Sequence, residues 1–260
     1  MSWLTRHWHR LNDRTIGSAG YWWIALQNAV VYSDTQRIAA RYVRGRTLDA
    51  GAGRLAWRPL LRRHSRTYVS GDLTAEHPEV DVLFDVTRPF PFPAESFDTV
   101  FCHSVLEHTR EPWRAMPEMW RVLAPGGVAI VAVPFVFYLH GQPHDYYRFS
   151  RYGLAYLAEQ AGFDVIETVA NGGLVDLLLN IPSVLLSTLL AAAGLARWIP
   201  PVTRFWLALA RQLARLDRSH LFTMNYIVVL RKATSSVSHT AGNADDRHSA
   251  RPDAPATIGR

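Results

Sequence analysis

The stretch from Arg46 to Asp72 constrains the fold more than any other part of the chain, because it reads as strand, glycine turn, helix and strand in direct succession. A short run ending in Asp49 is followed by Gly51 and Gly53, and a second run closes on Asp72. Strands that alternate with helices in this way predict a doubly wound, mostly parallel α/β sheet. In such sheets a glycine turn gives a nucleotide-like ligand access to the backbone, and an acid ending the second strand can bind ribose hydroxyls.

The glycine spacing alone does not identify the ligand. With Ala56 at the third position, it also fits a dinucleotide fingerprint, in which alanine is tolerated there. Asp49 separates the two alternatives, because a carboxylate in the turn would repel a nearby phosphate. The same carboxylate suits the cationic amino-acid end of S-adenosylmethionine, which carries no phosphate. We therefore expect S-adenosylmethionine rather than NAD as the cofactor.

Four phrases of the sequence, in the order in which they occur, resemble class I S-adenosylmethionine-dependent methyltransferases of the small "type 11" group. The chain departs from that pattern at Leu55, where the family's turn often has a third glycine. The resemblance extends from about Arg46 to about Gly173, with a further strand near Leu221 to Leu230. The phrases are LDAGAG with the acid Asp72 behind it, Phe84 to Thr109, Arg121 to Pro134, and Ala161-Gly162-Phe163.

The resemblance implies a seven-stranded Rossmann-like sheet that binds S-adenosylmethionine at the carboxyl ends of its strands. It implies that Asp49 meets the amino-acid end of the cofactor, directly or through water, and that Asp72 takes the ribose. Asp85, or the backbone of Val86, would face the adenine amino group. We expect the cofactor-binding residues to converge at one edge of the sheet: Asp49, Ala50, Gly51, Gly53, Asp72, Leu73, Asp85, Val86 and His103.

Composition narrows the class of protein. The 260 residues, 48% of them hydrophobic, suffice for one domain with a full core and appendages. The single cysteine, Cys102, excludes an intramolecular disulfide framework and a cysteine-rich metal site, which indicates a reducing, cytoplasmic compartment. The net charge of +6 comes without a dense Lys/Arg block, so no nucleic-acid partner is indicated. Gln27 and Asn28 interrupt the apolar segment near the N-terminus, so we expect a packed helix there and no signal peptide.

We divide the chain into an N-terminal helical cap at residues 1–45, a methyltransferase domain at 46–232 with an apolar helical insertion at 171–219, and a disordered tail at 233–260. In the cap, Tyr21 to Val43 reads as one or two helices, with Ser33-Asp34 able to cap the second. Residues 1–20 show no clear period. In related methyltransferases, such helices often cover the cofactor or shape the substrate entrance. We expect core packing, more than substrate contact, for Trp3, Trp8, Trp22 and Trp23.

The remaining elements follow from apolar runs and helical stripes. Only Leu73 to Val80 separates the second strand from the third, which is too short for a full crossover helix of roughly ten residues or more. Ser150 can cap a helix that Gly162 ends. We expect strands at 47–49, 67–70, 81–84, 97–102, 128–133, 163–169 and 221–230, and helices at 54–64, 113–123 and 151–160.

The loop from Phe135 to Ser150 holds the candidate catalytic side chains, because it follows the fifth strand directly and loops at this edge commonly bind substrate. His144 is the first candidate general base and His140 the second, since imidazole titrates near neutral pH, and Asp145 can orient one of them. Arg148 could hold an anionic group of the substrate. An Asp145–Arg148 ion pair that braces the loop over packed tyrosines is the alternative. The candidate substrate-binding residues are Tyr138, Tyr146, Tyr147 and Arg148.

Glu107 and His108 belong to the phrase LEH, which begins a helix or the loop before it. His108 could touch substrate, but we favour a role in capping and packing beneath the cofactor. We expect no metal site, because the histidines are scattered along the sequence and none pairs with an acid at ligand spacing on a predictable element.

The insertion contains an uncharged run, Leu177 to Ala196, that could cross a bilayer by its length alone. A single span conflicts with the resembled fold, in which the last strand returns to the same sheet. A return span at Val202 to Leu216 would bury three arginines, Arg204, Arg211 and Arg215. The remaining interpretations are an apolar lid or subunit interface and, favoured here, peripheral membrane contact or a lipid-like substrate at 177–216. The amphipathic stripe would be Val202, Phe205, Trp206, Leu209, Leu213 and Leu216.

These observations predict an S-adenosylmethionine-dependent methyltransferase that acts on a hydroxyl group of a small-molecule, lipid-like or glycan substrate. We expect it in the cytoplasm, peripherally at the inner face of the membrane. One alternative is a non-catalytic, methyltransferase-like binding module or partner subunit. Another, an NAD-linked oxidoreductase, is disfavoured by Asp49 and by the downstream phrases. The sequence leaves the substrate, the methylated atom and the oligomeric state open.

Overall fold

The structure is a computed structural model that describes residues 3–214 and 221–234 of the chain. The predicted disordered tail lies outside these ranges from residue 235 onward. Leu216, the last residue of the predicted amphipathic stripe, and Arg215, one of the three arginines near it, also lie outside the described residues.

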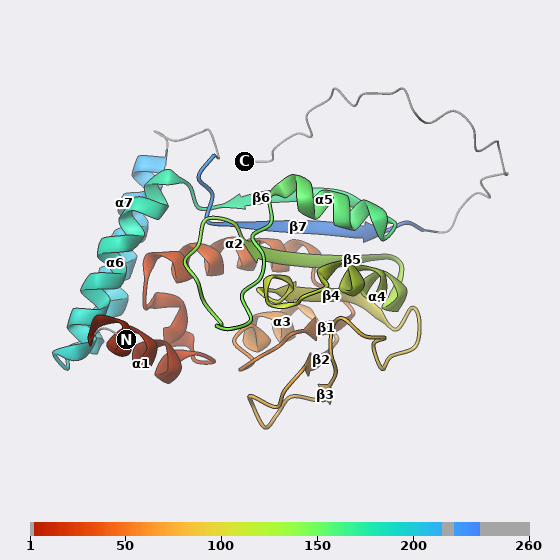
Figure 1. Cartoon of the computed structure of the whole chain (residues 1–260), viewed down its shortest axis with the longest axis horizontal. Coiled ribbons are helices and arrows are strands. Elements are labelled where there is room, and N and C mark those ends of the chain that lie inside the picture. Colours follow the sequence, from red (N-terminus) through yellow and green to blue (C-terminus); the bar gives the residue numbers. More distant parts are fainter. Residues whose placement is uncertain (1–2, 215–220, 235–260) are drawn as a thin grey trace.

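Within the described residues, one seven-stranded sheet runs in the order β3-β2-β1-β4-β5-β7-β6 (Figure 1). The first five strands are parallel, whereas β7 lies antiparallel between β5 and β6. This confirms the predicted doubly wound, mostly parallel sheet. The strands are β1 Arg46–Ala50, β2 Thr67–Asp72, β3 Val82–Leu83, β4 Phe97–His103, β5 Leu123–Pro134, β6 Phe163–Asn171 and β7 Asn225–Lys232.

Two strand boundaries differ from the prediction. β5 begins at Leu123 instead of Val128, because the turn-like Pro125-Gly126-Gly127 is absorbed as an irregularity in the pairing of β5 with β4. The last strand begins at Asn225 instead of Leu221, where it first pairs with both β5 and β6.

Helices cover both faces of the sheet, and alternate strand residues supply the two cores. Phe101 and Ile130 point to the face covered by α2 (Leu26–Tyr42) and α3 (Arg58–His64). Cys102 points to the other face, where α4 (Ala115–Val122) and α5 (Arg151–Gln160) pack. Burial raises the pKa of the Cys102 thiol, so this residue serves packing as expected.

Local backbone chemistry explains where several helices begin. α3 starts at Arg58 and not at residue 54, because Leu55 has a φ of +59°, which a right-handed helix cannot contain. α2 runs unbroken through Ser33-Asp34, so the alternative with two helices is wrong. The predicted cap of α5 is confirmed, since the Ser150 hydroxyl accepts a 3.2 Å hydrogen bond from the N–H of Gly153.

A helical layer stands beyond the carboxyl ends of the parallel strands, at the left of Figure 1. It consists of α1 (Trp3–Thr15), the 3-10 turn η1 (Ala19–Trp23), the start of α2, and the two helices of the insertion, α6 (Leu174–Ala192) and α7 (Ile199–Leu213). The short turn η4 (Ala196–Trp198) joins α6 to α7. The first of these helices was not predicted, because its buried side chains are few: only Trp8 and Leu11. The layer borders the edge of the sheet where the predicted site residues end their strands.

Candidate functional site

The glycine turn after β1 needs its two glycines for different reasons. Gly51 has a φ of +91°, and a Cβ on it would lie 2.2 Å from Cγ2 of Val105, so no side chain fits there. Gly53 has a φ of +50°, but nothing lies within 4 Å of an added Cβ, so this glycine faces open space. Leu55 takes the left-handed conformation that a third glycine would adopt more easily. Leu55 therefore adopts a positive φ although it is not glycine.

Asp72, at the end of β2, lies directly against this turn. Its Oδ2 accepts a 2.7 Å hydrogen bond from the N–H of Gly53, and its Oδ1 accepts a longer one of 3.3 Å from Thr74. The parallel register that pairs Ala50 with Gly71 brings the two segments together. Each carboxylate oxygen has two lone pairs, so acceptor capacity remains for ligand hydroxyls. The predicted ribose-binding acid and the glycine turn therefore form one unit.

Asp49 is buried beneath the turn, with 2% of its surface exposed. Its Oδ2 accepts a 2.8 Å hydrogen bond from the hydroxyl of Tyr68 on β2. Burial raises the pKa of Asp49 to about 7; the hydrogen bond from Tyr68 opposes this rise, and the charge of Asp72 adds to it. A cation held near the turn would favour the ionised carboxylate. Asp49 is thus suited to a ligand with a cationic end.

His103, the last residue of β4, is a neutral imidazole packed among aromatic rings. Its ring centroid lies 4.6 Å from that of Trp57 and 5.7 Å from that of Phe101. Burial lowers the pKa of His103 to about 3. Its Nε2 lies 3.4 Å from the Thr35 hydroxyl and its Nδ1 lies 3.1 Å from that of Ser104. His103 can therefore offer hydrogen bonds to a ligand, but no positive charge.

A cavity of about 280 Å³ lies at this edge, between the glycine turn, the loop after β5 and the N-terminal helices. Four predicted site residues line it: Gly51, Gly53, His103 and His140. The helical cap contributes lining residues that sequence reasoning did not single out as ligand contacts, including Tyr21, Trp22, Gln27 and Asn28. A larger hollow of about 550 Å³ surrounds Gly126 at the opposite end of β5, where no predicted site residue lies. We assign the site to the smaller cavity for that reason.

The residues predicted to hold the adenine lie along neighbouring strand ends, outside the cavity lining. Asp85 uses its Oδ1 to accept bonds from the N–H and the hydroxyl of Thr87, at 2.8 Å and 2.7 Å. Leu73 is exposed beside Asp72, whereas Val86 is buried. Ala50 is also buried, in β1 just before the turn. Adenine binding by these residues stays a prediction.

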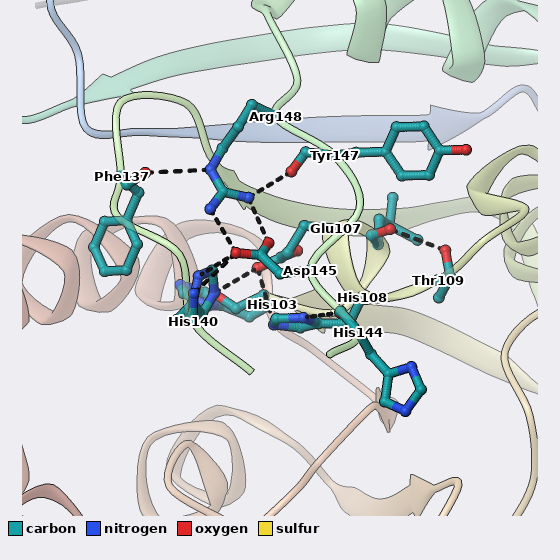
Figure 2. A network of polar contacts seen from close by, with 12 residues as sticks. His103, Glu107, His108, Thr109, Phe137, His140, His144, Asp145, Tyr147 and Arg148 are labelled. Carbon is teal, nitrogen blue, oxygen red and sulfur yellow. Dashed lines mark hydrogen bonds and ion pairs between the residues drawn. The ribbon is translucent and has the colours of Figure 1, made fainter. Parts of the chain in front are cut away.

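The loop after β5 is braced by Asp145 and Arg148 (Figure 2). The guanidinium Nη1 and Nη2 donate to the two carboxylate oxygens at 2.6 Å and 2.8 Å. These hydrogen bonds hold the pKa of Asp145 far below its usual range. The other donors of Arg148 bond to the backbone carbonyls of Phe137, Tyr138 and Tyr147. All five guanidinium N–H groups are engaged, which supports the bracing alternative over the binding of an anionic substrate group.

The other loop candidates do not gather at the cavity. His144 is exposed, its ring points away from the other histidines in Figure 2, and its Nδ1 lies 2.9 Å from the hydroxyl of Tyr146. Tyr147 donates to the carbonyl of Arg110, and Tyr138 stacks on Phe137. None of these side chains lines the cavity. His140 is therefore the predicted base that the structure places at the site.

The fold also creates a cluster that sequence reasoning missed. Oε1 of the buried Glu107 lies 3.8 Å from Nε2 of His108 and 3.7 Å from Nε2 of His140. The sequence argument considered ligand spacing on single predictable elements, so it did not find a cluster that joins two loops. The available signal was topological: both segments leave the carboxyl ends of paired strands, β4 and β5. The N–H of Tyr146 then bonds to the Glu107 carbonyl at 2.8 Å, which joins the two loops.

Comparisons with known proteins agree with this geometry. The family profile described as a methyltransferase domain matches residues 48–131, which span the glycine turn to β5. A Mycolicibacterium smegmatis protein named as a probable S-adenosylmethionine-dependent methyltransferase is 29% identical over 185 residues, covering 64% of this chain and 70% of its own length. The chain contains a class I S-adenosylmethionine-dependent methyltransferase domain.

Solved structures agree at the level of the fold. An S-adenosylmethionine-dependent methyltransferase from Archaeoglobus fulgidus superposes with a TM-score of 0.54 at 16% identity, covering 86% of this chain and 99% of its own. The [4+2]-cyclase SpnF superposes with a TM-score of 0.55 at 19% identity, covering 80% of this chain and 83% of its own. Because proteins of different named activity share this fold, the chemistry of this methyltransferase must be argued from its own residues.

The residues of the turn fit S-adenosylmethionine. Both glycines line the cavity, Gly53 faces open space, and Asp72 keeps lone pairs for the ribose. Asp49 offers a buried carboxyl group that a cation would ionise. A dinucleotide phosphate would meet the opposite effect there, since an approaching anion would disfavour the ionised carboxylate.

Proposed function

We propose that this methyltransferase methylates a hydroxyl oxygen of a lipid-like or lipid-linked small molecule at the cytoplasmic surface of a membrane. The observation that carries the proposal is the apolar outer face of α6, which belongs to the helical layer over the cavity. The polar groups at the cavity support the choice of a hydroxyl substrate.

S-adenosylmethionine, when bound, supplies a methyl group already activated by its sulfonium. The chain has to align the nucleophile and assist the loss of its proton. His108 and His140 place imidazole groups in the cavity lining, and the backbone N–H of His140 donates a 2.9 Å hydrogen bond to the Asp145 carboxylate. An imidazole nitrogen can accept the proton of a hydroxyl nucleophile, whereas a nucleophile that is already an anion needs no base.

The helix α6 buries polar residues on its inner side and exposes a stripe of apolar residues on its outer side. Asn180, Ser183, Ser187 and Thr188 are buried against the protein. The outward stripe exposes Leu178 (58%), Ile181 (68%), Leu185 (43%) and Leu189 (46%). A helix facing water on its outer side shows the reverse arrangement. Among the described residues, α6 is also the one helix long and apolar enough to cross a membrane.

The buried polar side of α6 is occupied in fixing α2. The hydroxyl of Ser183 accepts a 3.0 Å hydrogen bond from the N–H of Leu26, and Oδ1 of Asn180 accepts one of 3.1 Å from Gln27. These are the first N–H groups of α2, whose own N-cap, Ala25, has no side-chain acceptor. Because α6 is held by its polar side, the stripe of Leu178, Ile181, Leu185 and Leu189 remains outside. A membrane bound to that face would lie next to the cap that lines the cavity.

The helix α7 adds anchors and positive charge to the same layer. Phe205 of α7 and Trp198, the last residue of η4, are exposed, and Arg204 lies over the ring of Trp23 at 4.9 Å. Val202, Trp206, Leu209 and Leu213 of the predicted stripe are half-buried against the protein, so α7 presents less apolar surface than expected. Exposed aromatics beside arginines are typical of peripheral binding to anionic lipid.

Membrane contact can be tested by flotation with vesicles of phosphatidylethanolamine and phosphatidylglycerol. We expect the full chain to float and the double variant Ile181→Glu, Leu185→Glu to stay at the bottom of the gradient, because two carboxylates would face the lipid. The matched control is Tyr152→Glu, Tyr156→Glu, which places the same charges on exposed positions of α5, away from the helical layer. Equal flotation of the two double variants would remove the membrane proposal.

The substrate class can be tested with methyl-labelled S-adenosylmethionine. The purified chain is incubated separately with the lipid extract and the aqueous metabolites of its host. We expect label in the lipid extract, in a product one CH₂ heavier than its precursor. Label confined to the aqueous fraction would contradict the lipid-like substrate. Cofactor binding without transfer to either fraction would favour the non-catalytic partner subunit.

A further inference from the structure

Three potential metal ligands meet at the floor of the cavity. Glu107, His108 and His140 offer ligand atoms that all lie within 4.8 Å of one another. Figure 2 shows them converging from two loops, the turn after β4 and the loop after β5. His108 and His140 line the cavity, whereas Glu107 lies beneath them.

Glu107 is the group that most requires an explanation. Its side chain is fully buried, and neither carboxylate oxygen has a hydrogen-bond partner within the described part of the chain. A buried carboxyl group without a partner loses its hydration and gains nothing in return. The nearby Arg148 does not supply the missing bond, because its donors are committed to Asp145 and to the loop backbone.

The two histidines are oriented by acceptors on their outer sides. Nδ1 of His108 lies 2.7 Å from the carbonyl of His144, so it carries the hydrogen and donates it. Nδ1 of His140 lies 3.5 Å from the Asp145 carboxylate and 3.3 Å from the carbonyl of Tyr138. In both rings this leaves the Nε2 lone pair directed toward Glu107. Metal-binding histidines characteristically donate their second ring N–H to a carboxylate or a carbonyl in this manner.

The loop that carries His140 is shaped to pack against His108. Gly141 has a φ of +62°, and a Cβ on it would lie 2.6 Å from Cε1 of His108. The rings of His108 and His140 meet edge to face, with centroids 4.7 Å apart. A larger residue at position 141 would separate the two rings, so the close approach is built into the sequence.

We propose that Glu107, His108 and His140 bind one divalent transition-metal ion whose remaining coordination positions open into the cavity. Two nitrogens and one carboxylate suit zinc or a neighbouring first-row metal better than magnesium, which prefers oxygen ligands. Ligand atoms at about 2.1 Å from a common ion can be at most about 4.2 Å apart. The two spacings from Glu107, 3.8 Å and 3.7 Å, satisfy that limit.

The class of ligand that would complete the site is an oxygen donor, such as a substrate hydroxyl. This role rests on the proposed function, whereas binding of the ion does not. A hydroxyl oxygen on the ion has a lowered pKa, so its O–H bond breaks, the electron pair stays on oxygen and the proton leaves to water. His140 would then act as a ligand, and the ion would lower the pKa of the hydroxyl so that water could accept its proton.

The test is metal binding by the full chain, freed of metals with a chelator and then titrated with zinc chloride by calorimetry. Cobalt chloride, followed by its visible absorption, reports coordination by nitrogen and oxygen ligands. We expect one ion per chain, with an affinity that falls roughly 100-fold or more in Glu107→Gln and in His140→Gln. Asp145→Asn should weaken binding by about 10-fold, because it frees the His140 ring. The matched control is His144→Ala, which removes an exposed imidazole of the same loop and should leave affinity unchanged.

Absence of stoichiometric binding, or equal binding by Glu107→Gln and the unmodified chain, would overturn the proposal. Circular dichroism would test whether each variant is folded, and His140→Gln lies at a partly exposed position where the packing cost is small. Calorimetry with S-adenosylmethionine keeps the two proposals separate. Cofactor binding without metal binding would reject the ion and leave the methyltransferase assignment intact.

Discussion

Two regions with acidic residues lie at the same edge of the sheet, and they differ in whether the carboxylates accept hydrogen bonds from the chain. In the glycine turn, Asp72 accepts from the N–H of Gly53 and Asp49 accepts from the hydroxyl of Tyr68. In the histidine cluster, the carboxylate of Glu107 accepts no hydrogen bond from the described residues. One region is complete without a ligand, whereas the other is not.

This difference separates two ways of preparing a binding site. The glycine turn is held by strand register, so a ligand adds bonds to groups that are already satisfied. The histidine cluster keeps a buried group unsatisfied, so a ligand would remove a cost that the folded chain otherwise bears. Substitutions in the glycine turn should therefore reduce ligand affinity. Substitutions in the histidine cluster should reduce ligand affinity and also increase the stability of the ligand-free protein.

The largest effect is expected for Asp72→Ala. The variant loses the acceptor for the ribose hydroxyls and the bond from Gly53, so S-adenosylmethionine affinity should fall about 100-fold or more, which corresponds to roughly 3 kcal/mol. Calorimetry measures the change. Asp72→Asn is the matched control, because its amide oxygen can still accept from Gly53, and it should lose less. Similar affinity of Asp72→Ala and the unmodified chain would show that the turn does not hold the cofactor.

The pH dependence of cofactor binding comes next. Without cofactor, burial raises the pKa of Asp49 to about 7, so the group is mostly neutral below that pH. The cationic end of S-adenosylmethionine favours the ionised form, so binding should release a proton. Affinity should be constant above pH 7 and fall by up to about tenfold per pH unit below it. Calorimetry in buffers of different ionisation enthalpy counts the released proton.

Asp49→Asn tests that assignment. The amide can still accept from Tyr68 but cannot ionise, so the variant should bind more weakly above pH 7 and lose the pH dependence. A variant that retained the full pH profile would show that another group titrates.

Glu107→Gln should stabilise the metal-free protein. In the metal-free protein the amide can donate to Nε2 of His108 or His140, so we expect unfolding to cost about 1–2 kcal/mol more and Tm to rise roughly 2–6 °C. Asp49→Asn is the comparison at pH 6, where Asp49 is mostly neutral and the change should be small. Thermal melts in the presence of a chelator measure both. A lower Tm for Glu107→Gln would mean that the carboxylate has a stabilising partner.

The glycine turn was predictable because its contacts join adjacent parallel strands. A motif that ends β1 and an acid that ends β2 must meet once the sheet is assumed, so the Gly53–Asp72 contact follows from local pattern. The histidine cluster depends on the path of the loop after β5. That path is set by the Asp145–Arg148 pair and by the positive φ of Gly141. Neither feature shows from the sequence alone in which direction the loop runs.

The helical layer shows a second limit of sequence patterns. The start of α2 was expected to pack as a helix, but its first N–H groups are capped by residues more than 150 positions away, in α6. Periodicity cannot predict such a contact. The same contact explains why the polar residues of α6 are buried. The helical pattern alone would assign these polar residues to the outer face.

The smallest effect is expected for His144→Ala, and it separates the two histidines that sequence reasoning treated as alternatives. The His144 ring is exposed and contacts the hydroxyl of Tyr146, while the group that orients His108 is the backbone carbonyl of His144, which alanine retains. Methyl transfer should therefore stay within about twofold of the unmodified chain, whereas His140→Ala, which removes a side chain of the cavity lining, should lose about 100-fold or more. Initial rates with labelled S-adenosylmethionine measure both variants side by side. If His144→Ala lost as much activity as His140→Ala, the reacting oxygen would have to lie outside the cavity, near Tyr146, and the contrast between the turn and the cluster would no longer describe the active site.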